Sequence, residues 1–492
     1  MPIIPVLDWQ PDNADLGNPG SIQVVNALPG GRNSYKPFPQ HSALTGALTA
    51  RARGAIDARD RSQNVYQYAG DATKLYNLSG TTWNDVSRSS GGVYTTGAEE
   101  RWEFVVWKDK ILATNYSDDP QSITMGGANF AAFTTALRAR HIFVVGDHVV
   151  LANTFDGTDG DVADRVRWSA FEDETDFTVS PVTGSDFRDL KGGPIQRGFG
   201  GEFGVLFSLE HTYRMDPVGS PTFFRINQTI PEIGLIGPGA GARIGSQIFI
   251  WSNRGMQVIT NGTGHQPIGE GRVDQFLKTD LDDGYLHRIS AVSDPGSGRV
   301  FWAYPGSGNV DGRPNKIVCY DTTNNKWGFA EIETELLWQA GGVSFTLEQL
   351  DSFASSIDDL LVSLDSSQWK GDGNVLLAAF DTDFKHGFFQ GSPMTATIET
   401  RESEIRAGKR SELQAFRPLV DMGSFTAQVG TRNTLNEDVT WSPVLSPTST
   451  GRITKRSNAR YHRFRFFPTG EWKDALGVQV DRQDIRDVGL RG

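Results

Sequence analysis

Cysteine is almost absent from this sequence: among 492 residues, only Cys319 carries a thiol. A single cysteine excludes an internal disulfide framework and a cysteine-rich metal site. Long apolar runs are also missing, because no stretch approaches the ~20 consecutive apolar residues of a membrane span. The first residues show no basic segment followed by an apolar one, so no secretory signal is predicted. We therefore expect a chain that folds in a reducing cytoplasm and spans no membrane.

Signatures of catalysis and of metal binding are missing as well. The eight histidines are scattered, and no His-Glu-x-x-His or His-x-His spacing places two of them on one element. Neither a P-loop nor a Gly-x-Ser-x-Gly nucleophile motif occurs. The segment GPGAGARIG, residues 237–245, has the glycines of a nucleotide loop but continues into a strand pattern rather than a helix. The sequence therefore predicts no catalytic residues, no cofactor and no enzymatic activity.

Positive charge is scarce over most of the chain. Asp and Glu outnumber Lys and Arg by 59 to 47, which gives a formal net charge of −12. Up to residue 394 the ratio is 47 to 31, whereas from residue 395 onward Lys and Arg lead by 16 to 12. An acidic body argues against general affinity for nucleic acids. Two domains with different solvated faces would be enough to explain the asymmetry.

Short strand patterns fill the chain from residue 62 onward. Apolar runs alternate with polar ones and are interrupted by clusters of Gly, Asn, Asp and Ser. The clearest runs lie at 102–107, 110–115, 141–146, 148–155, 165–171, 202–209, 247–252, 256–260, 299–305 and 316–321. Their length and period predict strands rather than helices.

A hairpin phrase recurs within this region. KLYNLSGTTWNDV (74–86) and KIVCYDTTNNKWGFAEI (316–332) each contain a strand, a polar turn and a tryptophan that begins the return strand. Many short hairpins with weak similarity at spacings of roughly 40–55 residues are typical of a β-propeller, whose four-stranded blades bury their faces against neighbouring blades. We predict a mainly β fold with a six-bladed propeller, in which Trp83 and Trp327 fill the layers between blades.

Three regions are predicted along the chain. Residues 1–60 are rich in Pro, Gly, Asn and Arg and form an extended N-terminal arm with few strands. Residues 61–394 form the propeller, interrupted near 346–364 by a helical stripe that is either a packed insertion or an interaction helix. Residues 395–492 form a C-terminal β domain and tail, whose short alternating strands fit a small sandwich.

One loop gathers acidic residues. Asp156, Asp159 and Asp161 lie within DGTDGDVAD, which supplies enough oxygen ligands for calcium but lacks the spacing and terminal Glu of an EF-hand. A solvated Asp-Gly turn explains the same residues without a metal. The three aspartates are therefore a weak calcium candidate.

Arginines are concentrated near the C-terminus, in RITKRSNARYHRFRF (452–466). In a strand, Arg463 and Arg465 point to one face, while the phenylalanines between and after them point to the other. We predict that Arg456, Arg460, Arg463 and Arg465 form a basic stripe that docks an acidic partner surface. Because the whole chain is acidic and the stripe is short, nucleic-acid binding is the weaker reading, and a plain solvated strand face is a further alternative.

Several longer phrases are spread over most of the chain: NALPGGRNSYKPFP (26–39), YAGDATKLYNLSGTTWNDVSR (68–88), DRVRWSAFEDETDF (164–177), QTIPEIGLIGPGAGARIGSQIFIWSNRGMQVITNG (228–262), RPLVDMG (417–423), QVGTRN (428–433) and SNARYHRFR (457–465). They are structural rather than catalytic. Together they resemble a group of phage and prophage virion proteins, among which the tail nozzle or hub proteins of short-tailed phages, the packaged-DNA stabilisation proteins, are the nearest described relatives.

The resemblance implies a virion tail protein that assembles with itself, as a hexamer, into a tube below the portal and adaptor proteins. Such a protein would close the head after packaging, carry tail fibres or spikes and conduct DNA without sequence specificity. Assembly would take place in the host cytoplasm. An acidic tube wall fits this role, because its repulsion of the duplex acts over a Debye length of ~8 Å and prevents sticking.

Two other functions fit parts of the sequence. LSGTTWND (78–85) ends like the Asp-box of sialidase propellers, which suggests a glycan-binding or glycan-cleaving tail protein, but Leu78 occupies the Asp position. A cytosolic kelch-like interaction module is the third possibility. Rings or short tubes in electron micrographs would favour the nozzle, and saccharide binding would favour the glycan protein.

Overall fold

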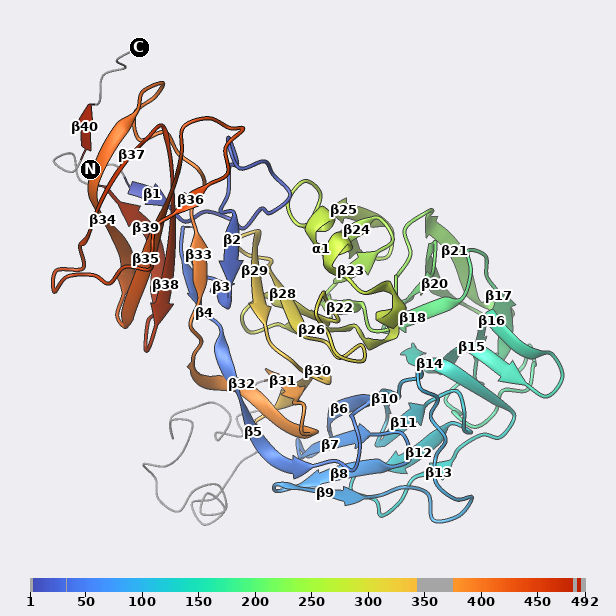
Figure 1. Cartoon of the computed structure of the whole chain (residues 1–492). Helices are drawn as coiled ribbons and strands as arrows, with labels where there is room; N and C mark the ends of the chain where they lie inside the picture. The colour runs from blue at the N-terminus through green and yellow to red at the C-terminus, as the bar shows by residue number, and fades with distance from the viewer. Residues whose placement is uncertain (1–2, 32, 343–374, 481–484, 488–492) are drawn as a thin grey trace.

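A computed structural model describes residues 3–31, 33–342, 375–480 and 485–487 (Figure 1). Antiparallel strands dominate these residues, which confirms the prediction of a mainly β fold. Helical structure in the described residues is limited to α1 (Asp274–Asp280) and a 3₁₀ helix, η1 (Asp283–Arg288). Neither is of the length and apolarity that a bilayer crossing requires. The helix predicted near 346–364 lies outside the described residues.

The strands of residues 39–393 are grouped into seven four-stranded antiparallel units, which are the blades of a β-propeller. The first blade contains β6 (Gly54–Arg59), β7 (Val65–Gly70), β8 (Leu75–Ser79) and β9 (Thr82–Asp85). The second contains β10 (Glu103–Trp107), β11 (Lys110–Thr114), β12 (Gln121–Thr124) and β13 (Ala131–Ala132). The third contains β14 (Leu137–Val145), β15 (His148–Asp156), β16 (Gly160–Trp168) and β17 (Asp186–Asp189).

The fourth blade contains β18 (Ile195–Phe199), β19 (Gly204–Ser208), β20 (Thr212–Gly219) and β21 (Phe223–Ile230). The fifth contains β22 (Gly241–Ile244), β23 (Gln247–Ser252), β24 (Gly255–Thr260) and β25 (Gly264–Pro267). The sixth contains β26 (Ser290–Asp294), β27 (Arg299–Tyr304), β28 (Lys316–Asp321) and β29 (Lys326–Glu331). The seventh contains β30 (Leu336–Gly341), β31 (Val375–Phe380), β32 (Lys385–Pro393) and β5 (Pro39–Ala47).

The predicted count of six blades is not confirmed, because the described strands form seven units. The difference arises at the seventh blade. Its outer strand β5 comes from the region assigned to the arm, and it pairs with β32, as in the register Phe388↔Ser42. Since the chain runs directly from β5 into the inner strand of the first blade, this pairing closes the ring between the last blade and the first.

The inner strands β6, β10, β14, β18, β22, β26 and β30 surround a common centre (Figure 1). The core lies mostly in the layers between adjacent blades. The Trp83 ring lies 5.7 Å from that of Phe380 in the seventh blade, and its Nε1 donates to Thr45 Oγ1 at 3.0 Å. Trp327 of the sixth blade donates to the Ile268 carbonyl next to the fifth, at 3.2 Å. The prediction that both tryptophans fill layers between blades is confirmed.

The remaining strands form a C-terminal unit, which we define as two sheets. One has the order β2-β33-β38-β35-β36, and the other has the order β4-β39-β34-β37, with β1 paired to β39 and β40 to β34. Their bounds are β1 (Ile3–Pro5), β2 (Gln23–Val25), β4 (Tyr35–Pro37), β33 (Thr397–Glu399), β34 (Ser411–Asp421), β35 (Ser424–Arg432), β36 (Thr440–Trp441), β37 (Ile453–Ala459), β38 (Tyr461–Thr469), β39 (Asp474–Gln479) and β40 (Ile485–Asp487). The sheets meet where Phe416 and Phe464 pack with ring centroids 5.0 Å apart.

Residues 3–47 connect the C-terminal unit to the propeller. Strand β3 (Ala27–Pro29) pairs with β29 of the sixth blade through Phe329↔Ala27 and with β4 on its other side. Strand β4 then pairs with β39, so one sheet continues from the sixth blade into the C-terminal unit. The segment predicted as an extended arm is therefore a set of strands shared between the two parts of the molecule.

Tyr35 stands at the centre of this connection and is fully buried. Its hydroxyl donates to the Trp327 carbonyl at 2.8 Å and accepts from the Trp9 amide at 2.9 Å. Burial, together with the nearby Asp8 carboxylate, raises the pKa of Tyr35. One neutral phenol therefore satisfies two buried backbone groups from distant parts of the chain.

His386 of β32 is also fully buried, and neither ring nitrogen has a hydrogen bond to a described residue. Its ring lies 4.9 Å from Trp338 and 5.0 Å from Phe388, centroid to centroid. Burial in this aromatic layer lowers the pKa of His386 to about 3. The imidazole is consequently neutral in the folded protein at physiological pH.

Replacing Tyr35 by Phe should lower the free energy of unfolding by about 1–3 kcal/mol, because the Trp9 amide and the Trp327 carbonyl lose a buried partner. Urea denaturation followed by tryptophan fluorescence measures the change. Tyr285→Phe is the matched control, since its hydroxyl has no hydrogen bond to a described residue, and it should unfold like the wild type. Equal effects of the two substitutions would contradict the role of Tyr35.

Replacing His386 by Leu should make the protein less sensitive to acid. In the unfolded chain the imidazole of His386 is protonated near pH 6.5, whereas in the folded protein it is protonated only near pH 3. The free energy of unfolding of the wild type therefore falls as the pH drops from 6.5 toward 3, by about 1.4 kcal/mol per pH unit for one such group. Urea denaturation at several pH values between 7 and 4 should show a shallower loss for His386→Leu. His265→Leu, at an exposed position, should retain the wild-type slope.

Candidate functional site

The described residues contain no group of three or more His, Cys, Asp or Glu side chains that could hold a metal ion. The three aspartates proposed for calcium lie around the β15–β16 hairpin. Asp156 accepts backbone bonds of 2.8 Å within its own turn and lies 3.4 Å from Arg167, while Asp159 pairs with Arg165. Asp161 is exposed. Because amides and guanidinium groups engage the Asp156 and Asp159 carboxylates, and no group of three ligands forms, the described residues do not assemble the calcium site.

The four predicted docking arginines do not form one exposed stripe. Arg463 and Arg465 are on β38, and both bind Glu399 of β33, which is 1% exposed. The Nη2–carboxylate distances are 2.5 Å for Arg463 and 2.6 Å for Arg465. Arg463 is itself buried and also lies 3.0 Å from Asp15. The alternation with Phe464 along the strand is confirmed, but the basic face points to carboxylates of the same chain and not to solvent.

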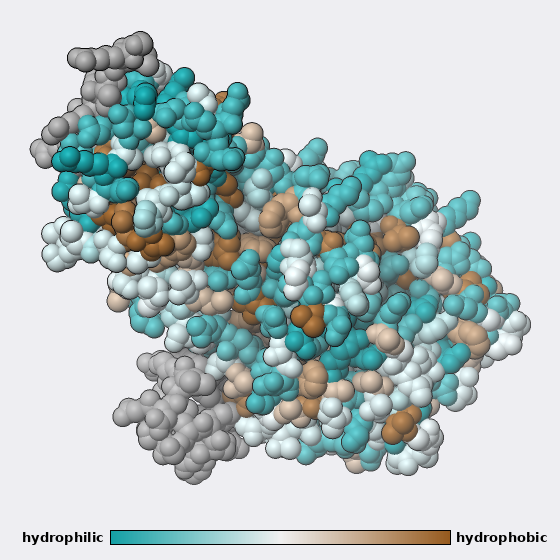
Figure 2. All heavy atoms as spheres, in the orientation of Figure 1, coloured by the Kyte–Doolittle hydropathy of each residue, from teal (hydrophilic) through white to brown (hydrophobic). Residues whose placement is uncertain are grey.

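Arg456 and Arg460 remain exposed. Arg456 is on β37, the last strand in the order of its sheet, and Arg460 follows this strand. Arg460 Nε lies 2.7 Å from Glu404, which places the 400–410 loop beside β37. We call the exposed side chains of Arg456, Arg460 and Lys409 the basic surface. Figure 2 shows hydrophilic residues over this outer end of the C-terminal unit.

Charge on an edge strand has a structural effect of its own. Lysine and arginine on a sheet edge oppose pairing with the edges of other chains. Arg456 therefore protects β37 from uncontrolled strand addition whether or not a partner docks there. Specific docking requires in addition a partner surface of opposite charge.

A second candidate site is the central cavity of the propeller, with a volume of about 450 Å³. All seven inner strands contribute to its wall. Its charged lining residues are Asp57, Arg101, Glu103, Arg197 and Arg243. A further cavity of about 390 Å³ adjoins it and shares Arg101 and Glu103.

Arg101 crosses from the second blade to the sixth. It precedes β10, and its Nη1 donates to the Ile289 carbonyl before β26 at 2.6 Å. Burial, together with the neighbouring Arg197, lowers the pKa of Arg101 to about 10. The guanidinium group therefore lies across one end of the central cavity.

The Glu103 carboxylate interacts electrostatically with both Arg101 and Arg197. Burial alone would raise the pKa of Glu103, but His141, Arg197 and Arg101 outweigh burial and lower the pKa. His141 Nδ1 lies 3.0 Å from the Glu103 carboxylate, and Nε2 lies 3.0 Å from the Ile195 carbonyl. The carboxylate is thus held by the histidine while it faces two guanidinium groups.

Sequence reasoning did not single out Arg101 or Arg197. The available signal was the glycine-rich segment 237–245, which was interpreted only as a failed nucleotide loop. As expected, this segment leads into a strand, β23, and not into a helix. The contacts of this segment with Arg101 and Arg197 form only when the propeller closes, and no local sequence pattern predicts them.

Comparisons with known proteins show fold similarity alone. No protein family model and no curated protein matches the chain. The WD40 domain of Neurospora crassa Pan2 is 7% identical with a TM-score of 0.40, covering 71% of this chain and 95% of that one. BamB from Moraxella catarrhalis is 10% identical with a TM-score of 0.32, covering 64% and 91%. An exo-β-1,3-galactanase from Phanerochaete chrysosporium is 11% identical with a TM-score of 0.29, covering 89% and 99%. Such values do not indicate a function.

Charge reversal should separate the buried arginines from the exposed ones. Arg463→Glu would place a second carboxylate beside Glu399, so we expect the C-terminal unit to lose about 3–5 kcal/mol of stability. Arg460→Glu changes an exposed group and should leave the unfolding transition close to that of the wild type. Thermal and urea unfolding measure both, and equal destabilisation would contradict the assignment.

Proposed function

We propose that this protein is a structural subunit of a phage tail nozzle or hub, which closes the portal channel, retains packaged DNA and conducts it during ejection. The subunits assemble with one another into a ring. Portal or adaptor proteins, and tail fibres or spikes, are the proposed neighbours in the virion. The proposal rests first on the sequence phrases that resemble those of virion proteins.

The structural observation that supports it best is the sheet that continues from the sixth blade through β3 and β4 into the C-terminal unit. A shared sheet, together with the buried Tyr35, resists bending between the two parts. Lys326 adds to the connection by donating to the Ser34 carbonyl at 3.0 Å. A body of this kind holds two separate surfaces at a fixed distance and angle, which is what a ring-forming subunit requires.

The charge difference between the two parts suggests how the copies meet. Residues 1–394, which include the propeller and also strands β1, β2 and β4 of the C-terminal unit, carry 47 acidic against 31 basic side chains, while residues 395–492 carry 12 against 16. Opposite charges on different ends of one subunit favour head-to-tail contacts, and head-to-tail contacts generate rings when the rotation closes. The basic surface of one copy would then face the acidic propeller of the next.

The central cavity of the propeller is not the proposed path for DNA. It has a volume of about 450 Å³, and Arg101 lies across one end. A passage for the duplex must therefore be formed between subunits, around the axis of the ring. The acidic charge of the propeller suits such a wall, because repulsion within a Debye length of ~8 Å keeps the DNA from binding.

The glycan-binding or glycan-cleaving alternative has less support. The partial Asp-box depends on Trp83, which is buried and hydrogen-bonded to Thr45. A ring in that position does not stack on a sugar. No other described feature favours this alternative.

Electron microscopy of the purified protein tests the proposal directly. Negative-stain images should show hollow rings or short tubes, and a saccharide array should show no binding. Discrete monomers that bind glycans would contradict the nozzle and support the alternative.

The double substitution Arg456→Glu with Arg460→Glu should raise the subunit concentration needed for ring formation roughly tenfold, because it reverses the charge of the basic surface. Sedimentation velocity across a concentration series measures the effect. Raising the salt concentration should weaken the wild-type assembly in the same direction.

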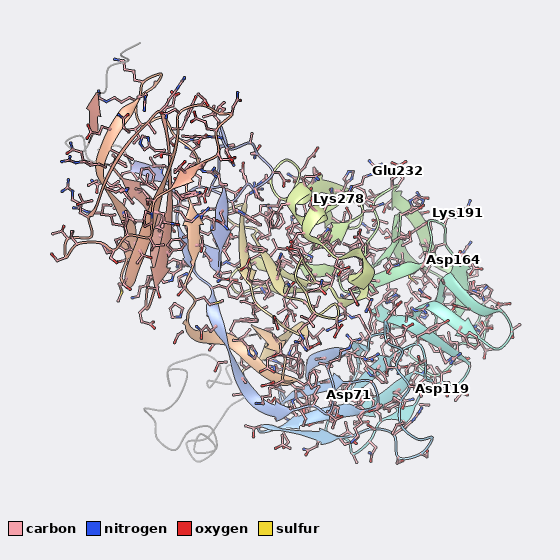
Figure 3. All side chains as sticks on the ribbon, in the orientation of Figure 1. Asp71, Asp119, Asp164, Lys191, Glu232 and Lys278 are labelled. Atoms are coloured by element: carbon pink, nitrogen blue, oxygen red, sulfur yellow. The ribbon has the colours of Figure 1, made fainter. Side chains whose placement is uncertain are left out.

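The matched control is Lys191→Glu with Lys278→Glu, at two exposed lysines of the propeller (Figure 3). This control makes the same change in net charge but leaves the C-terminal unit intact. Both double variants should show wild-type thermal unfolding. If the control weakens the assembly as much as the test variant, net charge rather than the basic surface drives association.

A further inference from the structure

The glycine-rich segment 237–245 receives side chains from two other blades. The backbone at Gly239 lies against Arg101 and the Ile289 carbonyl, and a Cβ atom there would overlap both. Glycine at this position therefore allows the guanidinium group of Arg101 to reach across the cavity. The segment therefore accommodates an arginine side chain, and it leads into a strand instead of the helix that follows a nucleotide loop.

Arg197 reaches the same segment from the fourth blade. Its Nη1 donates to the carbonyls of Pro238 and Gly241, both at 3.3 Å. The Arg197 side chain also lies over the Phe199 ring, 5.0 Å from the centroid. Two guanidinium groups from different blades thus converge on one stretch of backbone at the wall of the central cavity.

The charge of this pair is not fully compensated. Among the described residues, the hydrogen bonds of Arg101 and Arg197 go only to backbone carbonyls, and neither forms an ion pair. Glu103 faces both arginines, but it is a single carboxylate that also binds His141. The charged lining of the cavity is Arg101, Arg197 and Arg243 against Asp57 and Glu103, which leaves one excess positive charge.

Donors remain available at both arginines. A guanidinium group has five N–H donors, and only Nη1 of each arginine hydrogen-bonds a described residue. Arginine forks match the planar, bidentate geometry of oxyanions. The cavity, at about 450 Å³, is large enough for such an anion.

We propose that a small oxyanion, such as phosphate or sulfate, binds in the central cavity between Arg101 and Arg197, against the glycine-rich segment 237–245. Arg243 also lines this cavity, but it bonds the Gly245 carbonyl at 2.7 Å and the Gly200 carbonyl, so it is not counted as a ligand. The anion ties the second, fourth, fifth and sixth blades together. This binding does not depend on assembly into a ring.

Thermal unfolding of the purified full-length protein tests the site. After dialysis into a chloride buffer, added inorganic phosphate or sulfate at constant ionic strength should raise the Tm with saturation, because a ligand of the folded state stabilises it. Arg197→Gln should weaken the apparent affinity by roughly tenfold or more, through loss of charge-assisted hydrogen bonds. Calorimetric titration with phosphate provides the same affinity independently.

Arg254→Gln is the matched control. Arg254 is exposed on the fifth blade and pairs with Glu232, outside the cavity. This variant should retain the full response to phosphate. A wild type without a saturable rise in Tm, or equal losses in both variants, would overturn the proposal.

A second variant keeps the test valid if Arg197→Gln does not fold. Arg197→Lys keeps a positive charge but removes the planar fork, so it should fold and bind phosphate more weakly than the wild type. Unchanged phosphate affinity in Arg197→Lys, measured by calorimetry, would also overturn the proposal.

Discussion

The pairing of β5 with β32 is the constraint on which the rest of the structure depends. It closes the propeller by joining a strand from residues 39–47 to one from residues 385–393. The residues just before β5 then lie in the C-terminal unit and between the two parts, where Tyr35 bonds Trp327. The same short segment, residues 35–47, therefore closes the propeller and attaches it to the C-terminal unit. Neither part is a free-standing module.

Arginine has different tasks in the two parts of the molecule. In the C-terminal unit, Glu399 neutralises Arg463 and Arg465, and the result is a buried connection between strands. At the centre of the propeller, Arg101 and Arg197 meet backbone carbonyls and share one carboxylate, so positive charge is left over. The first arrangement serves stability, and the second is suited to an anion. The distinction depends on which carboxylates are near, and not on the arginines themselves.

Much of the fold follows from local sequence patterns. Alternating apolar runs predicted the strands of the blades, and the tryptophans of two similar hairpins were correctly assigned to the layers between blades. The number of blades was not predictable in this way, because the outer strand of the seventh lies more than three hundred residues from its partner. Polar composition made residues 39–47 look like an arm, since an outer strand has one exposed face and few apolar residues.

The candidate sites show the same limit. Alternation along residues 461–467 correctly separated arginines from phenylalanines, but Asp15 and Glu399, which bury the arginine face, are distant in sequence. Their contribution required the three-dimensional arrangement. Arg101 and Arg197 were missed for a related reason, because neither is unusual in its local sequence and the pair is distinctive only once the fold brings them together.

The origin of β5 also has a consequence for synthesis on the ribosome. At elongation rates of about 5–20 residues per second, its partner β32 is translated roughly 20–70 s after it. During that interval the nascent chain carries an unpaired strand and an open circle of blades, both of which expose edges to other chains.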